Sequence, residues 1–236
     1  MQHPEVPGNV YGEIMQEKHT NCRDSVVLIQ TKNIYRCGLI VACGDNFCYV
    51  LTTKDYQLSN CKSEIIITFG DETEKSFHAN DVVVESGNTL SILVLRDVIG
   101  TVWPAREPVR FRNEFSSEND LEEALVYTLS YIPKASTKYG GGSTASSYFR
   151  GGNPGVVGVF GGKGVFYHNC STGSDVIKGS AVFNGNRYII GINLEYSTGW
   201  IKVLRLTEIK EEITQIFPDT RDMAFAGIKH YMEAKG

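Results

Sequence analysis

The sequence lacks any apolar run long enough to cross a bilayer, and it lacks an excess of basic residues. Its longest apolar runs, such as Ser25–Gln30, are far shorter than the roughly 20 residues that a membrane-spanning helix needs. The 27 acidic side chains outnumber the 23 lysines and arginines, which gives a net charge of −4. Because nucleic-acid binders more often carry a basic excess, the composition argues against a membrane protein and against a nucleic-acid partner.

The N-terminal residues also lack the basic segment and the apolar segment that together mark a secretory signal peptide. Residues 1–22 are instead polar, contain two prolines and are predicted to form an N-terminal arm. We therefore expect an intracellular protein, either cytoplasmic or nuclear.

Paired metal-ligating motifs are missing as well. The six cysteines include no Cys-x-x-Cys pair and the five histidines include no His-x₃₋₅-His pair, so no metal site is predicted. No cofactor motif occurs either. A chain of this length can bury a hydrophobic core without disulfides, so we expect free, mostly buried thiols. The cysteines are Cys22, Cys37, Cys43, Cys48, Cys61 and Cys170.

The sequence does contain short β-rich runs separated by turn residues, and these runs fall into two sets. Several of them are almost continuously apolar, which is typical of strands that are covered on both faces. The first set comprises Ser25–Gln30, Ile34–Ala42, Asn46–Thr52, Ser63–Gly70, Lys75–Glu85 and Leu90–Leu95. The second comprises Pro108–Arg112, Leu125–Tyr131, Gly155–Phe160, Gly164–His168, Ser180–Asn184, Arg187–Glu195 and Trp200–Val203.

Two sets of about six strands predict an all-β fold, a double six-stranded β-barrel. The double-barrel domain is expected at 23–205, with barrel 1 at about 23–96, a linker at 97–122 and barrel 2 at about 123–205. Within barrel 2, the glycine- and serine-rich run at 139–152 predicts a surface loop.

The C-terminal segment, residues 206–236, changes to a helical pattern. Leu206, Ile209, Ile213 and Ile216 recur at helical spacing and predict a helix at Thr207–Phe217, with Thr207 as its N-cap. A second, weaker amphipathic run follows at residues 219–234. Both helices are expected to pack on the barrels, and the alternative is that the last one docks a partner.

Three segments carry motif remnants in a fixed order. Tyr49–Tyr56 is an apolar strand that ends in two threonines and a turn, and Asn88–Leu95 is an apolar strand with a polar start. Cys170–Asn184 contains a glycine followed by Ser-Ala-Val-Phe. In this order and spacing, the three segments resemble the chymotrypsin/trypsin-like serine protease superfamily across residues 25–205.

The resemblance implies a trypsin-like double barrel and places the three catalytic positions. The histidine position is occupied by Asp55, the aspartate position by Thr89 and the serine position by Lys178. The glycine two residues before the nucleophile becomes Val176, which we expect to displace the backbone donors of the oxyanion hole. The resemblance therefore implies a catalytically inactive homologue, a pseudoprotease that lacks the Ser-His-Asp triad.

The replacements remove the chemistry that the family's reaction requires. A carboxylate is a poor general base near neutral pH, and it lacks the second ring nitrogen through which an imidazole contacts a third residue. An amine must lose a proton before it can attack, and an adjacent carboxylate stabilises the protonated form. We predict that Asp55 and Lys178 form an ion pair, with Thr89 donating to Asp55.

The sequence thus favours a non-enzymatic protein-binding, scaffold or regulatory protein. A protein or peptide partner is expected, because protease-like grooves can bind extended peptides by strand addition. The candidate ligand cleft comprises Asp55, Lys178, Gly179 and Ser180. The alternative is an active cysteine-type hydrolase with a relocated site at His168 and Cys170.

Overall fold

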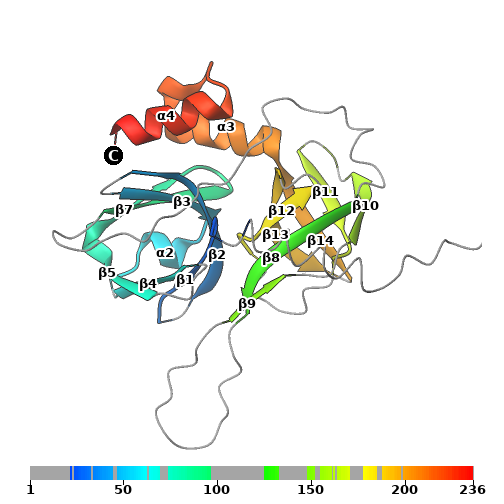
Figure 1. Cartoon of the computed structure of the whole chain (residues 1–236), viewed down its shortest axis with the longest axis horizontal. Coiled ribbons are helices and arrows are strands. Elements are labelled where there is room, and N and C mark those ends of the chain that lie inside the picture. The colour runs from blue at the N-terminus through cyan, green and yellow to red at the C-terminus, as the bar shows by residue number, and fades with distance from the viewer. Residues whose placement is uncertain are drawn as a thin grey trace, which may run out of the picture.

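The computed structural model of the chain describes residues 22, 24–32, 34–44, 47–62, 64–69, 74–96, 125–132, 148–151, 155–160, 162, 164–170, 178–184, 188–197 and 199–235. Two antiparallel sheets lie side by side, and two C-terminal helices cover one side of the molecule (Figure 1). Residues 1–21 of the predicted arm, the linker at 97–122 with its strand Pro108–Arg112, and residues 139–147 of the predicted loop lie outside the described residues.

The first sheet has seven strands in the order β5-β4-β1-β2-β3-β7-β6. The run Lys75–Glu85, predicted as one strand, is divided by a 3-10 turn at Ala79–Asp81, so that its halves pair with different neighbours, β4 and β7. The strands are β1 (Val26–Gln30), β2 (Tyr35–Cys43), β3 (Phe47–Thr53), β4 (Glu64–Thr68), β5 (Glu74–His78), β6 (Val82–Ser86) and β7 (Leu90–Arg96), with the short helix α2 (Tyr56–Ser59) after β3.

The second sheet has the order β10-β11-β14-β13-β12-β8-β9, and β10 also pairs with β8. Six strands therefore form a closed barrel, as the sequence predicts. Strand β9 pairs with β8 outside this closed ring (Figure 1). The strands are β8 (Leu125–Ile132), β9 (Tyr148–Gly151), β10 (Gly155–Phe160), β11 (Val165–His168), β12 (Ala181–Asn184), β13 (Ile189–Ser197) and β14 (Trp200–Arg205).

One strand departs from the sequence-based expectation. Residues 148–151 were assigned to the glycine-rich loop, but they form β9, whose register with β8 runs from Leu129 opposite Gly151 to Ile132 opposite Tyr148. Strand formation here depends on pairing with β8 rather than on local composition, because β propensity is strongly dependent on tertiary context.

The hydrophobic core lies inside each barrel and between the barrels. Strand β1 shows why its sequence is continuously apolar: Val26 and Leu28 join the cluster shared by both barrels, whereas Val27 and Ile29 fill the interior of barrel 1. Successive side chains of a strand point to opposite faces, so a strand buried on both faces has no polar alternation. The predicted double barrel is therefore confirmed together with the reason for its sequence pattern.

The C-terminal helices are α3 (Leu206–Ile216) and α4 (Phe225–Lys235), joined by a 3-10 turn at Pro218–Thr220. The N-cap of α3 is Arg205 and has no side-chain cap bond, so the prediction of Thr207 as the cap is wrong. Helix α3 contacts β13 and β14 in the second sheet, and α4 contacts β2 in the first.

The buried apolar residues of both helices belong to the core cluster shared by the two barrels. In α4 these are Phe225, Ile228 and Met232, so its apolar face is covered by the protein's own barrels. We expected this packing. The alternative was that the last helix docks a partner, and that would require an uncovered apolar face, which α4 does not have.

Two cysteines form a disulfide, which corrects the expectation of free thiols. Cys43 and Cys48 are directly opposite one another at the end of the β2–β3 hairpin, with their Cα atoms 4.3 Å apart. The neighbouring Gly44–Phe47 pair is hydrogen-bonded at 3.0 Å, so Cys43 and Cys48 occupy the closer, non-hydrogen-bonded kind of pair. The thiols of Cys22, Cys37 and Cys170 are buried and that of Cys61 is half-buried, as expected.

Candidate functional site

Asp55 stands where β3 ends and α2 begins. Its backbone is extended, and one carboxylate oxygen accepts the backbone N–H of Gln57 at 2.7 Å, which makes Asp55 the N-cap of α2. Aspartate is among the best N-cap residues because its side chain satisfies a backbone donor that the helix leaves unpaired. At the histidine position of the resemblance, the side chain therefore has a structural role at a helix start.

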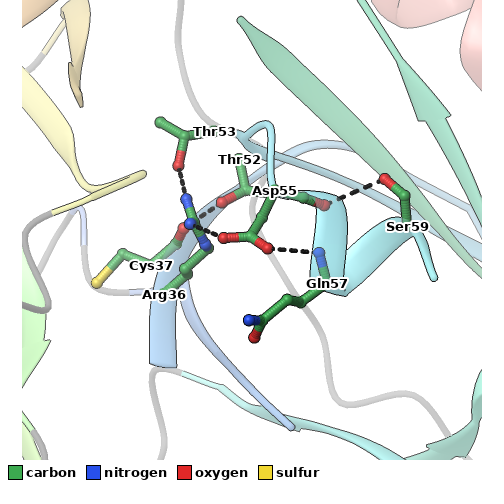
Figure 2. Close-up of polar contacts among 7 residues, drawn as sticks. All are labelled: Arg36, Cys37, Thr52, Thr53, Asp55, Gln57 and Ser59. Atoms are coloured by element: carbon green, nitrogen blue, oxygen red, sulfur yellow. Dashed lines mark hydrogen bonds and ion pairs between the residues drawn. The ribbon is translucent and has the colours of Figure 1, made fainter. Parts of the chain in front are cut away.

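The second oxygen of the Asp55 carboxylate pairs with Arg36 of β2, whose guanidinium also donates to the Thr53 hydroxyl (Figure 2). We call Arg36, Thr53 and Asp55 the charged cluster. The Arg36 and Asp55 side chains are only 11% and 19% exposed, and Arg36 Nε is buried without a hydrogen-bond partner. Arg36 was not among the predicted site residues, although a cation inside the apolar run Tyr35–Cys43 was a visible signal.

The predicted ion pair between Asp55 and Lys178 is wrong. The carboxylate is engaged by Arg36 and by Gln57, whereas the Lys178 side chain is exposed. Arg36 suits this place better, because a planar guanidinium on the neighbouring strand reaches the carboxylate and the Thr53 hydroxyl at once.

The main chain around Lys178 joins the two barrels. The Cys37 N–H of β2 donates to the Lys178 carbonyl at 3.0 Å, and the Gly179 N–H donates to the Asn193 carbonyl of β13 at 2.9 Å. Gly179 has a φ of +83°, and a Cβ there would lie 2.1 Å from the Cys37 carbonyl oxygen and 2.6 Å from Thr52 Oγ1. This position therefore requires glycine, because the segment lies directly against β2.

Thr89 lies in the turn between β6 and β7, beside the chain that leads to Asp55. Its carbonyl accepts the Lys54 N–H at 2.7 Å, and its own N–H donates to the Glu212 carboxylate of α3 at 2.9 Å. The same carboxylate accepts the Asn88 N–H at 2.7 Å. The predicted bond from the Thr89 hydroxyl to Asp55 is not among the contacts of the described residues, in which Thr89 acts through its main chain.

The three predicted triad positions are thus brought to one region by main-chain contacts, but their side chains do not interact. Of the four candidate cleft residues, Lys178 is exposed and Asp55 is partly exposed, whereas Gly179 and Ser180 are buried. Val176, whose effect on the oxyanion hole was predicted, lies outside the described residues. No group of three or more His, Cys, Asp or Glu side chains among the described residues is arranged to hold a metal ion.

The alternative site at His168 and Cys170 is fully inside barrel 2. Cys170 N–H donates to His168 Nδ1 at 3.1 Å, and His168 Nε2 bonds to Asn193 Oδ1 at 2.9 Å. The Cys170 thiol donates to the Val126 carbonyl at 3.4 Å. Burial lowers the pKa of His168 from 6.5 to about 4, against the opposing effect of the Asn193 bond. Both ring nitrogens are therefore engaged, and neither faces the thiol as a base would.

Asn193 extends this cluster toward Lys178–Ser180, which we call the Lys178 segment. Its side-chain amide donates to Thr128 Oγ1 and to Ser180 Oγ, each at 2.9 Å, and the Thr128 hydroxyl donates to the Ala181 carbonyl at 2.7 Å. We call His168, Asn193, Thr128 and Ser180 the His168 network. All four side chains are buried and neutral.

Comparison with known proteins identifies the fold. No protein-family model and no curated protein sequence matches the chain. The solved Rv3671c protease from M. tuberculosis H37Rv, a serine-to-alanine mutant in an inactive form, aligns with a TM-score of 0.60 and 16% identity over 87% of this chain and 92% of that one. A serine endoprotease from Yersinia pestis aligns with a TM-score of 0.61 and 14% identity, covering 92% of this chain and 70% of that one.

A third solved structure, Deg5, aligns with a TM-score of 0.60 and 11% identity over 93% of this chain and 99% of that one. At these identities the likeness concerns the fold alone. The chain has the chymotrypsin-like double-barrel fold of the trypsin-like serine proteases, as the motif remnants implied. No helix of the described residues is long and apolar enough to span a membrane.

Proposed function

We propose that this chain is a pseudoprotease: a non-enzymatic protein-binding, scaffold or regulatory protein on a trypsin-like fold. The observation that carries the proposal is the engagement of the Asp55 carboxylate. One oxygen caps α2 and the other pairs with Arg36, at the position that the resemblance assigns to the family's histidine. A side chain fixed in this way neither abstracts a proton nor orients an imidazole.

The other two positions support the same conclusion. Lys178 offers an exposed ammonium in place of a hydroxyl, with no imidazole among its described contacts. Thr89 has no carboxylate, and the carboxylate that reaches its turn, from Glu212, is bound to two backbone N–H groups. Nucleophilic catalysis needs a nucleophile beside a base, and the described residues provide no such pair at this site.

A protein or extended peptide is the proposed ligand class. Strand β13 pairs with β12 only as far as Ile192, whereas its pairing with β14 continues to Ser197. No described strand covers the other edge of Leu194–Ser197. Such an edge can accept a peptide by strand addition, with main-chain hydrogen bonds supplying affinity.

The Cys43–Cys48 disulfide weighs against the expected intracellular location, because disulfides are rare where glutathione and thioredoxin keep thiols reduced.

Binding can be tested with extended peptides selected from a random display library against the folded chain. We expect selected peptides to lose about tenfold in affinity for a Lys178→Glu variant, which corresponds to about 1.4 kcal/mol. Lys62→Glu is the matched control, because Lys62 is exposed, lies after α2 and reverses the same charge. Equal loss in both variants, or no selectable peptide, would contradict binding at the Lys178 surface.

A further inference from the structure

The His168 network is a continuous series of buried hydrogen bonds that leads from β11 to the Lys178 segment. It begins with Cys170 N–H donating to His168 Nδ1 and continues from His168 Nε2 to Asn193 Oδ1. From Asn193 it passes to Ser180 Oγ and Thr128 Oγ1. All four side chains are fully buried, so a broken contact here has no water to replace it.

The direction of every bond in this series is fixed by its first member. A backbone N–H can only donate, so His168 Nδ1 must carry a lone pair, and the proton of the neutral ring lies on Nε2. The ring then donates to Asn193 Oδ1, which turns the Asn193 amide nitrogen toward Thr128 and Ser180. The neutral Nε2–H form of His168 therefore determines the orientation of Asn193.

Asn193 in turn holds the main chain of the candidate site. Its carbonyl accepts the Gly179 N–H and its N–H donates to the Ser180 carbonyl, each at 2.9 Å, in addition to the side-chain bond to Ser180 Oγ. Three contacts from one residue thus fix the segment that follows Lys178. On its other side the segment is held by the Cys37 N–H of barrel 1.

We propose that His168 is a positioning residue of the candidate site, which sets the main-chain position of Lys178–Ser180 through Asn193 and releases it when the imidazole is protonated. The inference rests on the proposed function only in assigning this segment to the ligand-binding surface. Protonation puts a second donor at Nδ1, facing the Cys170 N–H, and places a charge in a fully buried site.

Among the described residues, those that face His168 offer no charge to compensate. Its partners across the sheet are Val157 of β10 and Ile201 of β14, and β13 and β8 contribute the neutral Asn193 and Thr128. The titratable group beside it is the Cys170 thiol. On β13 and β14, the charged residues that follow Asn193 and Ile201 most closely are Glu195 and Lys202. Their side chains pair with each other at 3.1 Å and are partly exposed.

Hydrogen–deuterium exchange of the whole protein tests this inference without any ligand. Between pH 6.5 and about 4, we expect protection of residues 178–184, after correction for intrinsic exchange, to fall about tenfold more than protection of β7. In a His168→Gln variant, which keeps a donor for Asn193 and does not titrate, protection of 178–184 should not change with pH.

Three results would overturn the inference. They are unchanged protection of 178–184 in the wild type, a parallel fall in β7, or the same pH profile in His168→Gln. If that variant does not fold, histidine ring NMR of the wild type decides: opening of 178–184 must share its midpoint with the titration of His168. Peptide turnover would refute the proposed function and leave the exchange result intact, so the two failures are distinguishable.

Discussion

The charged cluster and the His168 network lie on opposite sides of the Lys178 segment and are built from different chemistry. The charged cluster joins an arginine and an aspartate at the surface of barrel 1, where part of each side chain is accessible. The His168 network joins neutral groups that are fully buried in barrel 2. Charge is present where water can still reach it, and the buried side uses a directed series of neutral bonds.

The difference separates a cluster at a predicted triad position from a network that supports the backbone beside another one. Asp55 stands at the position that the resemblance assigns to the catalytic histidine, and its ion pair and helix cap occupy the carboxylate. The His168 network has no side chain at a triad position, yet it fixes the backbone beside one. Variants in the Lys178 segment, in the charged cluster, in the His168 network and at the Thr89 turn can test this difference.

The largest effect is expected for Gly179→Ala in the Lys178 segment, where the two barrels meet. The new Cβ would meet the Cys37 carbonyl at 2.1 Å with φ at +83°, so a backbone must move. We expect a loss of about 4 kcal/mol in the free energy of unfolding, from backbone strain plus overpacking. Gly199→Ala is the control, because Gly199 has a φ of +88° and open space around it. It should lose about 1 kcal/mol in urea unfolding, and equal losses would refute the close contact.

The charged cluster should be the next most sensitive feature. Asp55→Ala leaves the Arg36 guanidinium without its partner and removes the cap of α2, so we expect a loss of about 3 kcal/mol in the free energy of unfolding. The double variant Arg36→Met/Asp55→Asn removes both charges and keeps a capping side chain, and it should lose less. Chemical denaturation measures both, and a double variant at least as damaged as Asp55→Ala would contradict the account.

The His168 network should make stability depend on pH. The folded-state pKa of His168 is about 4 and the unfolded-state value is 6.5, so the unfolded chain takes up a proton first as the pH falls. The contribution is fully present above pH 6.5, declines toward pH 4 and then levels off, by about 3 kcal/mol in all. Thermal melts of the wild type and His168→Gln across this range should diverge, and parallel curves would assign the acid sensitivity to other groups.

The smallest effect is expected at the turn that carries Thr89. Glu212→Gln removes the negative charge that receives the Asn88 and Thr89 N–H groups, and about 1 kcal/mol of unfolding free energy should be lost. Gln215→Ala is the control, because it removes only an exposed bond to the Asn88 side chain. Urea midpoints for the two variants should differ, with Gln215→Ala close to the wild type.

Much of the fold could be predicted because the core pattern is local. A strand buried on both faces, such as β1, can be predicted from its continuous apolar run. Helix α3 can be predicted from its apolar residues at helical spacing. The order of the motif remnants was enough to place Asp55 at a strand end. Strand β9 was missed because its stability comes from pairing with β8.

The partners within the site were harder to predict. Arg36 and Asp55 are 19 residues apart, and their contact depends on how β2 and β3 align after an irregularity between Ile40 and Ala42. The bond between His168 and Asn193 spans 25 residues and two non-consecutive strands. The disulfide was more accessible to prediction, since Cys43 and Cys48 flank the turn residues of a hairpin symmetrically.

A peptidase assay shows whether the chain has catalytic activity. The wild-type chain, Lys178→Ala and Cys170→Ala would be incubated with a fluorogenic peptide library and with serine- and cysteine-directed covalent probes, beside an active trypsin-like protease. We expect no turnover above buffer and no active-site labelling for all three proteins. Reproducible turnover by the wild type that disappears in Lys178→Ala or in Cys170→Ala would contradict this expectation.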